Sequence, residues 1–249
     1  MSKSLNVATI QLAERVGYGS VVSMARSAGF SQYIQPTPAV ALGAYESTPL
    51  EIAAAYTVFA NHGVYVQPHL VSYVRGDGGA RIYSHRPVTH RVLTPQVAYL
   101  MVNLLEEVLR SGTGAGVRAR GFTVPAAGKT GTSRDGWFAG FTSDLLCVVW
   151  VGFDDHRDLK LEGAKSALPI WTEFMKQAVL LIGRPKSFQP PSGILTAQVD
   201  PLSGQLATPE CPEVQSEIFI LGTQPVEFCG RHGSPVVDTK STASSVGAQ

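Results

Sequence analysis

Apolar residues recur at helical spacing through the first half of the chain. A glycine directly follows each of the helices that this periodicity predicts, over residues 5–16, 21–28, 49–62 and 95–111. The third helix has a clear start signal, because Thr48-Pro49-Leu50-Glu51 forms a capping box with proline at the first helical position. After that helix, residues 69–75 and 80–83 are expected to form a hairpin around Asp77-Gly78.

The periodicity changes from residue 129 onward. Short β-branched or aromatic runs are separated by polar turn residues, which predicts an antiparallel meander over residues 129–133, 137–142 and 145–153. The third run is apolar on both alternating faces, so helices are expected to cover it on both sides. The predicted fold class is α/β of the α+β type, an antiparallel sheet flanked by helices.

The last predicted helix, over residues 169–182, ends at Gly183. Its spacing predicts one buried stripe made of Ile170, Phe174, Ala178 and Leu181. Beyond it the chain becomes rich in proline, with strand-like runs at 194–199 and 217–221. We therefore expect a main domain over residues 1–185, a small β extension over 186–233 and a disordered tail over 234–249.

Composition and charge exclude several classes of function. The chain has 249 residues, of which 44% are hydrophobic, and this suffices for one large core or two unequal ones. The net charge of +1 gives no long-range field toward phosphate backbones, so no nucleic-acid partner is expected. The longest apolar run, residues 145–153, is about half of the ~20 residues that a membrane-spanning helix needs, so no membrane segment is expected within the chain.

The first candidate for chemistry is Lys129-Thr130-Gly131-Thr132, at the start of the meander. It offers a cation, two hydroxyls and a glycine that lets a substrate backbone come close. Strand alternation places Lys129 on one face and both threonines on the other, so a shared ligand requires a twist or a bend. The alternative is an ordinary strand start with a solvated lysine.

A second candidate is Ser4-Leu5-Asn6, which supplies a hydroxyl and a carboxamide at the head of the first helix. An ordinary helix cap is the alternative role of Ser4. Together, Ser-x-Asn before a helical region and Lys-Thr-Gly at the start of a strand match two of the three motifs of the serine acyl-transfer enzymes that include penicillin-binding proteins.

From Ser4 to about Ile182 the chain resembles the C-terminal part of the transpeptidase domain of class A penicillin-binding proteins. Further stretches carry the resemblance in the family's order: residues 41–46, 48–51, 112–114, 127–132, 135–138 and 150–154. The resemblance implies the β-lactamase/transpeptidase-like fold, incomplete at its N-terminus, in which a five-stranded antiparallel sheet is flanked by helices and the lysine strand borders the active-site cleft. It also implies extracytoplasmic cross-linking of peptidoglycan stem peptides, binding of β-lactams, and no metal or organic cofactor.

The resemblance assigns roles to the candidate residues position by position. Lys129 would set the electrostatics of the cleft, while Thr130 and Thr132 would bind the terminal carboxylate of the donor peptide. The backbone N–H of Thr132 would be one of two oxyanion-hole donors. Ser4 would relay a proton to the leaving amine, and Asn6 would hold the substrate's amide.

Two further glycines and a threonine belong to the same implied site. Gly131 would let the substrate backbone approach the strand. Thr113 and Gly114 would form a loop on the rim of the cleft. A flexible connector after a helix stop is the alternative role of this loop.

One departure from the family concerns the nucleophile, a serine three residues before a lysine. None of the seven lysines of this chain has serine at that spacing. We therefore expect a piece of a longer, membrane-anchored protein with glycosyltransferase and transpeptidase domains, inactive alone and with an exposed sheet edge where two strands are missing. The alternative is a non-catalytic module that binds peptidoglycan stem peptides.

The cysteines leave one further question open. Cys211 and Cys229 flank a segment that a single disulfide could close, and a bridge is expected if the chain is exported. With His232 they suggest zinc, but there is no Cys-x-x-Cys and the sequence shows no clear fourth ligand, so no metal site is expected. Cys147, in an apolar run, is expected to be a small buried hydrophobic residue.

Overall fold

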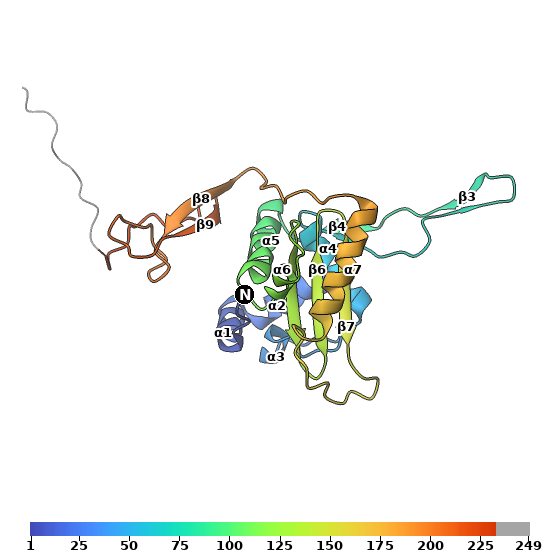
Figure 1. Ribbon diagram of the computed structural model, residues 1–249, viewed down its shortest axis with the longest axis horizontal. Coiled ribbons are helices and arrows are strands. Elements are labelled where there is room, and N and C mark those ends of the chain that lie inside the picture. Colours follow the sequence, from blue (N-terminus) through green and yellow to red (C-terminus); the bar gives the residue numbers. More distant parts are fainter. Residues whose placement is uncertain (233–249) are drawn as a thin grey trace, which may run out of the picture. The chain divides into compact units, whose positions relative to one another are not determined.

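The computed structural model describes residues 1–232 of the protein (Figure 1). The chain divides into two compact units, the first over Met1–Pro191 and the second over Ser192–Gln249. This division falls after Pro191, whereas the sequence placed the boundary after residue 185. The tail expected to be disordered, residues 234–249, lies outside the described residues.

All helices of the described residues lie in the first unit: α1 (Asn6–Val16), α2 (Tyr18–Ser27), α3 (Pro38–Ala41), α4 (Pro49–Ala60), α5 (Pro95–Arg110), α6 (Gly116–Ala119) and α7 (Ala167–Ile182). None of them is both long and apolar enough to cross a membrane. The strands of the first unit are β1 (Val64–Val66), β2 (Tyr73–Arg75), β3 (Arg81–Ser84), β4 (Thr89–Arg91), β5 (Ala127–Thr132), β6 (Gly136–Phe141) and β7 (Leu146–Val151), and those of the second are β8 (Ile194–Val199) and β9 (Gln215–Ile220).

The main sheet is the predicted meander, with strand order β5-β6-β7 and antiparallel pairing throughout. Polar turns separate its strands as the sequence indicated, and the register places Lys129 opposite Ala139. The resemblance implies five strands, whereas this sheet has three within the described residues. Within the described residues, the outer strands β5 and β7 each pair only with β6. Their outer edges are therefore unpaired there, as expected.

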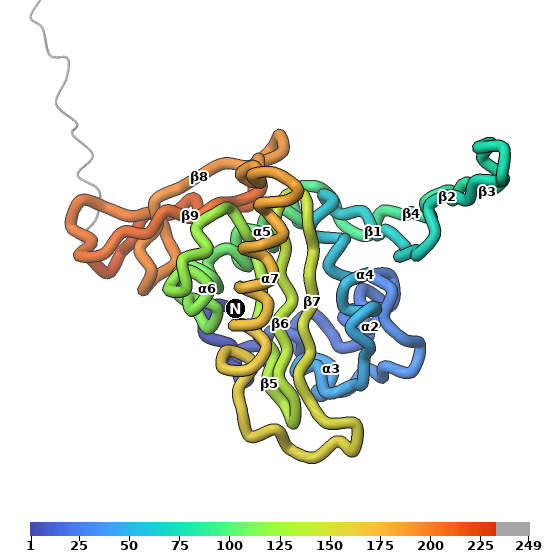
Figure 2. The backbone as a smooth tube through the Cα atoms, turned by 45° about the vertical axis from the view of Figure 1, so that its right-hand side comes forward, coloured from blue at the N-terminus to red at the C-terminus, as the bar shows by residue number. Residues whose placement is uncertain are grey.

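Helices cover both faces of this sheet (Figure 2). On one face, Phe138 of β6 packs against Trp171 of α7, with ring centroids 4.8 Å apart. On the other face, Phe141 packs against Tyr56 of α4 and among buried residues of α5. Strand β7 contacts both α4 and α7, which confirms the expected cover on its two sides. Its side chains are mostly half-buried, because β7 is an outer strand.

The buried stripe predicted for α7 is wrong. Three of its four residues are exposed, namely Ile170 (53%), Phe174 (51%) and Leu181 (87%), and Ala178 is half-buried. The buried face consists instead of Ala167, Leu168, Trp171, Thr172 and Met175. The helix is apolar nearly all round, so spacing alone allowed either face. The indole of Trp171 decides between them, because it packs over Gly140 and donates a hydrogen bond to the carbonyl of Cys147 at 3.0 Å.

Local chemistry predicted several element boundaries correctly. The capping box at α4 is present, with Thr48 Oγ1 accepting from the Glu51 N–H at 3.1 Å and the Thr48 N–H donating to the Glu51 carboxylate at 2.8 Å. Gly17 follows α1 with a φ of 89°, as the left-handed end position requires. The hairpin around Asp77-Gly78 is confirmed as β2–β3.

Other boundaries differ from the expectations. Helix α2 begins at Tyr18, three residues before the predicted start, and the short helix α3 was not predicted. The β1–β4 pair, which joins the chain on either side of the hairpin, was not predicted either. Three-residue strands carry too little periodicity to be recognised in a sequence.

The second unit contains one antiparallel pair, β8–β9, in register from Ile194 opposite Ile220 to Val199 opposite Gln215. The sequence predicted both strands, the second over 217–221, and the structure begins it at Gln215. The described part of this unit therefore has the β character expected of the extension.

The packing of α7 predicts unequal costs for two identical substitutions. Phe138→Ala removes a ring with no exposed surface and should lower the free energy of unfolding by about 3–5 kcal/mol. Phe174→Ala removes a ring that is 51% exposed and should cost less than about 1 kcal/mol. Urea unfolding of both variants measures this difference. Equal losses would show that the buried face of α7 is assigned wrongly.

Candidate active site

Strand β5 carries Lys129, whose ammonium lies among oxygen atoms from two distant parts of the chain. Its Nζ donates to the Ser4 hydroxyl at 3.1 Å and to the Thr130 carbonyl at 2.8 Å. The side chain is half-buried, and this burial lowers the pKa of Lys129 below that of a free lysine, because desolvation disfavours the charged form. A solvated lysine at a strand start would have neither feature, so this alternative is wrong.

Lys129 and Thr130 approach each other although they start on opposite faces of the strand. The lysine side chain turns back along β5, so that its Nζ lies 3.4 Å from the Thr130 hydroxyl. The expected twist or bend of the strand is therefore not required for these two residues, because the flexible four-carbon stem of lysine spans the difference.

Thr113 joins the same group of atoms from the loop after α5. Its hydroxyl oxygen lies 2.6 Å from that of Thr130, which is only 9% exposed. Its backbone N–H donates to the Ser2 carbonyl at 3.0 Å. The contact favours a role for this loop at the site over a flexible connector.

A glycine allows the N-terminal segment to lie against this loop. A Cβ added at Gly112 would meet the Ser2 carbonyl oxygen at 2.5 Å and the Val108 Cα at 2.9 Å. Gly114 is constrained in a similar way, since a Cβ there would lie 2.7 Å from a Leu109 methyl carbon. Gly112 therefore permits close packing of the start of the chain against this loop, and Gly114 permits close packing of the loop against the end of α5.

Ser4 does not cap the first helix, so that alternative is wrong. The residue that precedes α1 is Leu5, and no side chain caps this helix. Ser4 instead has a φ of 52°, which is uncommon for a residue with a side chain, and its hydroxyl accepts from Lys129. The serine is held in a turn, because its N–H donates to the Met1 carbonyl at 3.1 Å.

Four of the predicted residues therefore form one hydrogen-bonded group, which we call the lysine cluster: Ser4, Thr113, Lys129 and Thr130. Asn6 lies outside it. Asn6 is the first residue of α1, and its side chain is exposed and makes no hydrogen bond with the described residues.

Thr132 lies on the same strand but has a different partner. Its hydroxyl accepts a hydrogen bond from the Gly163 N–H at 2.9 Å, and within the described residues no hydrogen bond joins that hydroxyl to the lysine cluster. A Cβ at Gly163 would lie only 2.2 Å from the Gly131 carbonyl oxygen, so a glycine is needed where this loop approaches β5. The sequence analysis missed Gly163, and its only signal was a glycine shortly before the last helix.

The expected disulfide between Cys211 and Cys229 is not formed. Both are buried free thiols, and Cys229 contacts Asp200 and His232 instead. Cys147 is half-buried rather than buried, since it lies on an outer strand, and burial raises the pKa of its thiol to about 11.

Comparison with known proteins identifies the family to which the chain belongs. Residues 1–176 match the family model described as the penicillin binding protein transpeptidase domain. The chain belongs to the penicillin-binding protein transpeptidase family. Residues 190–234 match a second model, described as the C-terminal domain of penicillin-binding protein 1A.

Relatives with this fold extend well beyond the present chain. Penicillin-binding protein 1A of Aquifex aeolicus is 32% identical over 234 residues, which cover 92% of this chain and 32% of the relative. The crystal structure of penicillin-binding protein 1A from Haemophilus influenzae is similar with a TM-score of 0.82 at 27% identity, over 92% of this chain and 40% of that one. The chain thus spans about a third of the length of the curated relative.

The fold is also shared with penicillin-binding protein A from M. tuberculosis, solved as a ceftriaxone acyl-enzyme complex. That likeness has a TM-score of 0.59 at 23% identity and covers 71% of this chain and 46% of that one. At this identity the likeness concerns the fold alone.

The contact between Thr113 and Thr130 predicts a measurable loss of stability. Thr113→Val removes the nearest partner of a buried hydroxyl and should lower the free energy of unfolding by about 1 kcal/mol. The matched control is Thr123→Val, at an exposed position without a side-chain hydrogen bond, which should change it by less than about 0.5 kcal/mol. Thermal unfolding at fixed pH measures both, and similar losses would argue against the contact.

Burial of Lys129 predicts a pH dependence of stability with a definite sign. The pKa of this lysine is lower in the folded state, so between the folded value and about 10.4 the unfolded chain binds more protons. The free energy of unfolding of the wild type, minus that of Lys129→Met, should therefore rise with pH across this window. Denaturant titrations of both proteins at several pH values measure this difference in the free energy of unfolding. Groups that titrate alike in the two proteins cancel in the subtraction. A difference that stays flat or falls would contradict the burial.

Proposed function

We propose that the chain is the part of a peptidoglycan D,D-transpeptidase that holds the lysine side of the acyl-transfer site. One observation carries this proposal: the Lys129 ammonium donates to Ser4 from the Ser-x-Asn motif and lies beside Thr130 of the Lys-Thr-Gly motif. The two motifs lie 125 residues apart in the sequence, and both belong to the family's cleft.

The lysine cluster and Thr132, on the same strand, suit recognition of a peptide that ends in a carboxylate. The Lys129 ammonium offers a positive charge, and the Thr130 and Thr132 hydroxyls are donors that can bind the terminal carboxylate of a donor stem peptide or of a β-lactam. Gly131 lies between the threonines and lets the peptide backbone approach the strand. The Thr132 N–H is proposed as an oxyanion-hole donor, a contribution that costs about 3 kcal/mol or more when removed in acyl-transfer enzymes.

Ser4 is proposed to relay a proton during acyl transfer. A nucleophilic serine attacks the carbonyl of a D-Ala-D-Ala bond, the C–N bond breaks, and the released D-alanine takes up a proton through the Ser4 hydroxyl. Lys129, in hydrogen-bond contact with that hydroxyl, favours its orientation toward the leaving amine. An amine of a neighbouring stem peptide then accepts the acyl group. Asn6 is proposed to hold the substrate's amide, and Thr113 and Gly114 to border the cleft.

The nucleophile of this reaction is not among these 249 residues, since none of the lysines follows a serine at the family's spacing. We propose that a longer protein supplies it, that this protein is membrane-anchored and extracytoplasmic, and that it also carries a glycosyltransferase domain. The chain alone would then bind substrate weakly and catalyse nothing. The reaction as proposed uses no metal or organic cofactor.

The missing Ser-x-x-Lys motif favours a second candidate function, a module that binds peptidoglycan stem peptides without reacting with them. Such a module would keep the carboxylate-binding strand β5. The coding sequence upstream of Met1 distinguishes the candidates, because the transpeptidase requires an in-frame Ser-x-x-Lys there.

Intact mass after incubation with a labelled penicillin tests the proposal. The 249-residue chain should gain no adduct, whereas the chain extended through its upstream coding sequence should gain one per molecule, on the serine of Ser-x-x-Lys. In the extended chain, Lys129→Ala should slow acylation at least about 100-fold, as loss of an active-site electrostatic group does elsewhere.

Two outcomes would overturn parts of this scheme. An adduct on the 249-residue chain that is lost in Lys129→Ala would make a serine of this chain, with Ser4 the first suspect, the nucleophile. An upstream sequence without Ser-x-x-Lys, and no adduct on either chain, would favour the binding module.

A further inference from the structure

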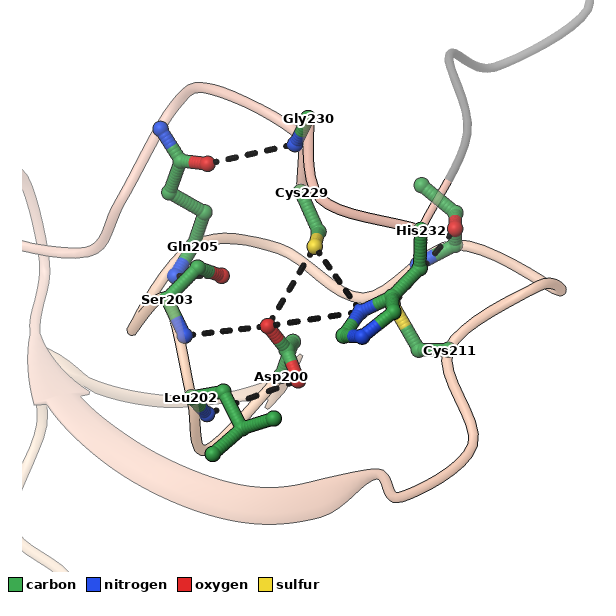
Figure 3. Close-up of polar contacts among 9 residues, drawn as sticks. Asp200, Leu202, Ser203, Gln205, Cys211, Cys229, Gly230 and His232 are labelled. Atoms are coloured by element: carbon green, nitrogen blue, oxygen red, sulfur yellow. Dashed lines mark hydrogen bonds and ion pairs between the residues drawn. The ribbon is translucent and has the colours of Figure 1, made fainter.

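Four metal-ligating side chains converge in the second unit, far from the lysine cluster in the sequence. They are Asp200, Cys211, Cys229 and His232, and one potential ligand atom of each lies within 4.8 Å of those of all the others. Figure 3 shows these side chains pointing toward one another from separate segments of the unit. Three of the four are buried and His232 is half-buried.

Three of the six separations between these atoms are close to those of a tetrahedral site. Cys229 Sγ lies 3.2 Å from Asp200 Oδ2 and 3.3 Å from His232 Nδ1, and His232 Nδ1 lies 3.7 Å from Asp200 Oδ2. Ligands of a tetrahedral Zn²⁺ with ordinary bond lengths are about 3.3 to 3.8 Å apart. Cys211 Sγ lies within 4.8 Å of the other three donor atoms, so side-chain movements of about 1 Å would bring all four donors to the spacing around one zinc ion.

Backbone pairing holds the segments that carry the donors. Asp200 directly follows β8, and its N–H donates to the Gln205 carbonyl at 2.9 Å. The Cys229 N–H donates to the Leu206 carbonyl at 2.8 Å, which places the C-terminal segment beside the same turn. His232 follows Cys229 by three residues, and its Nδ1 lies 3.3 Å from Cys229 Sγ. The C-terminal segment therefore supplies two of the four donors.

Hydrogen bonds from the backbone orient two of the donors. The Ser203 N–H donates to Asp200 Oδ2 at 2.9 Å. The Thr208 N–H donates to Cys211 Sγ at 3.3 Å, and the Thr208 hydroxyl lies 3.5 Å from the same sulfur. Such partners fix ligand orientation and stabilise the negative charge of thiolates and carboxylates at metal sites.

Residues 192–232, the described part of the second unit, have almost no hydrophobic core of their own. The buried residues of this part are Val199, Asp200, Thr208, Cys211 and Cys229. Only one of them is an aliphatic side chain, and three are members of the cluster. The unit, Ser192–Gln249, is shorter than about 70 residues, and natural domains of that size often rely on disulfides, metal ions or oligomerisation for stability.

We propose that Asp200, Cys211, Cys229 and His232 bind one structural Zn²⁺ ion. Two thiolates, one imidazole and one carboxylate form a donor set that favours zinc over the hard cations Mg²⁺ and Ca²⁺. Four protein ligands fill the tetrahedral coordination shell, so the site is structural and keeps no position for substrate. Binding breaks the two S–H bonds, forms two Zn–S bonds and releases two protons to solvent, with no change of oxidation state.

The sequence analysis missed this site because its fourth ligand is an aspartate eleven residues before Cys211. The spacing is also unlike that of a zinc finger, since 17 residues separate the two cysteines. The competing structure is a Cys211–Cys229 disulfide, which requires the two sulfur atoms to approach to about 2.05 Å. Cys229 Sγ instead lies against the carboxylate and the imidazole.

Zinc content of the full chain tests the proposal. The reduced wild-type chain is incubated with ZnCl₂, gel-filtered and analysed by inductively coupled plasma mass spectrometry, and about one zinc per chain is expected. Cys229→Ser and His232→Ala should each weaken zinc binding at least about 100-fold. The matched control is Cys147→Ser, which removes the one cysteine outside the cluster and should leave the zinc content unchanged.

A second measurement does not depend on the folding of any variant. In the zinc-loaded wild type, Cys211 and Cys229 should resist alkylation by iodoacetamide until a chelator is added, as mass mapping of the peptides would show. Co²⁺ in place of zinc should give the intense visible bands of a tetrahedral thiolate site. A wild-type chain that retains no zinc, or whose two thiols are released by a reductant and not by a chelator, would overturn the proposal.

Discussion

The candidate active site depends on one constraint, that the N-terminal segment must lie against the loop after α5. The Thr113 N–H holds the Ser2 carbonyl at 3.0 Å, and two residues later Ser4 accepts a hydrogen bond from Lys129. This approach is possible because Gly112 has no Cβ. The lysine cluster therefore forms where three segments meet: strand β5, the loop after α5 and the first residues of the chain.

Packing of the two helical layers fixes the position of β5 in turn. Phe138 and Phe141 point to opposite faces of β6, the first toward α7 and the second toward α4 and α5. The α5 helix contributes to the second layer and also leads directly into the loop of Thr113. Its packing therefore links the hydrophobic core to the site.

Features that depend on neighbouring residues could be predicted from the sequence, whereas those that depend on distant ones could not. The capping box at Thr48 and the meander were predicted because their causes are local. The face of α7 was wrong because the ring of Trp171, packed over Gly140, decides between two apolar stripes. The motifs of Ser4 and Lys129 were recognised, but their direct contact, the contact of Thr113 with Thr130, and the place of Asp200 beside two cysteines arise only in the folded chain.

The distance along the chain between Ser4 and Lys129 has a consequence for folding. Closing a loop of 125 residues costs about 4 kcal/mol of chain entropy plus a constant, more than one exposed hydrogen bond returns. The contact between them therefore costs less chain entropy once α4, α5 and the sheet have shortened the effective loop. During synthesis Ser4 is added to the chain roughly ten seconds before Lys129. Throughout that interval the Ser4 hydroxyl has no lysine ammonium from which to accept a hydrogen bond.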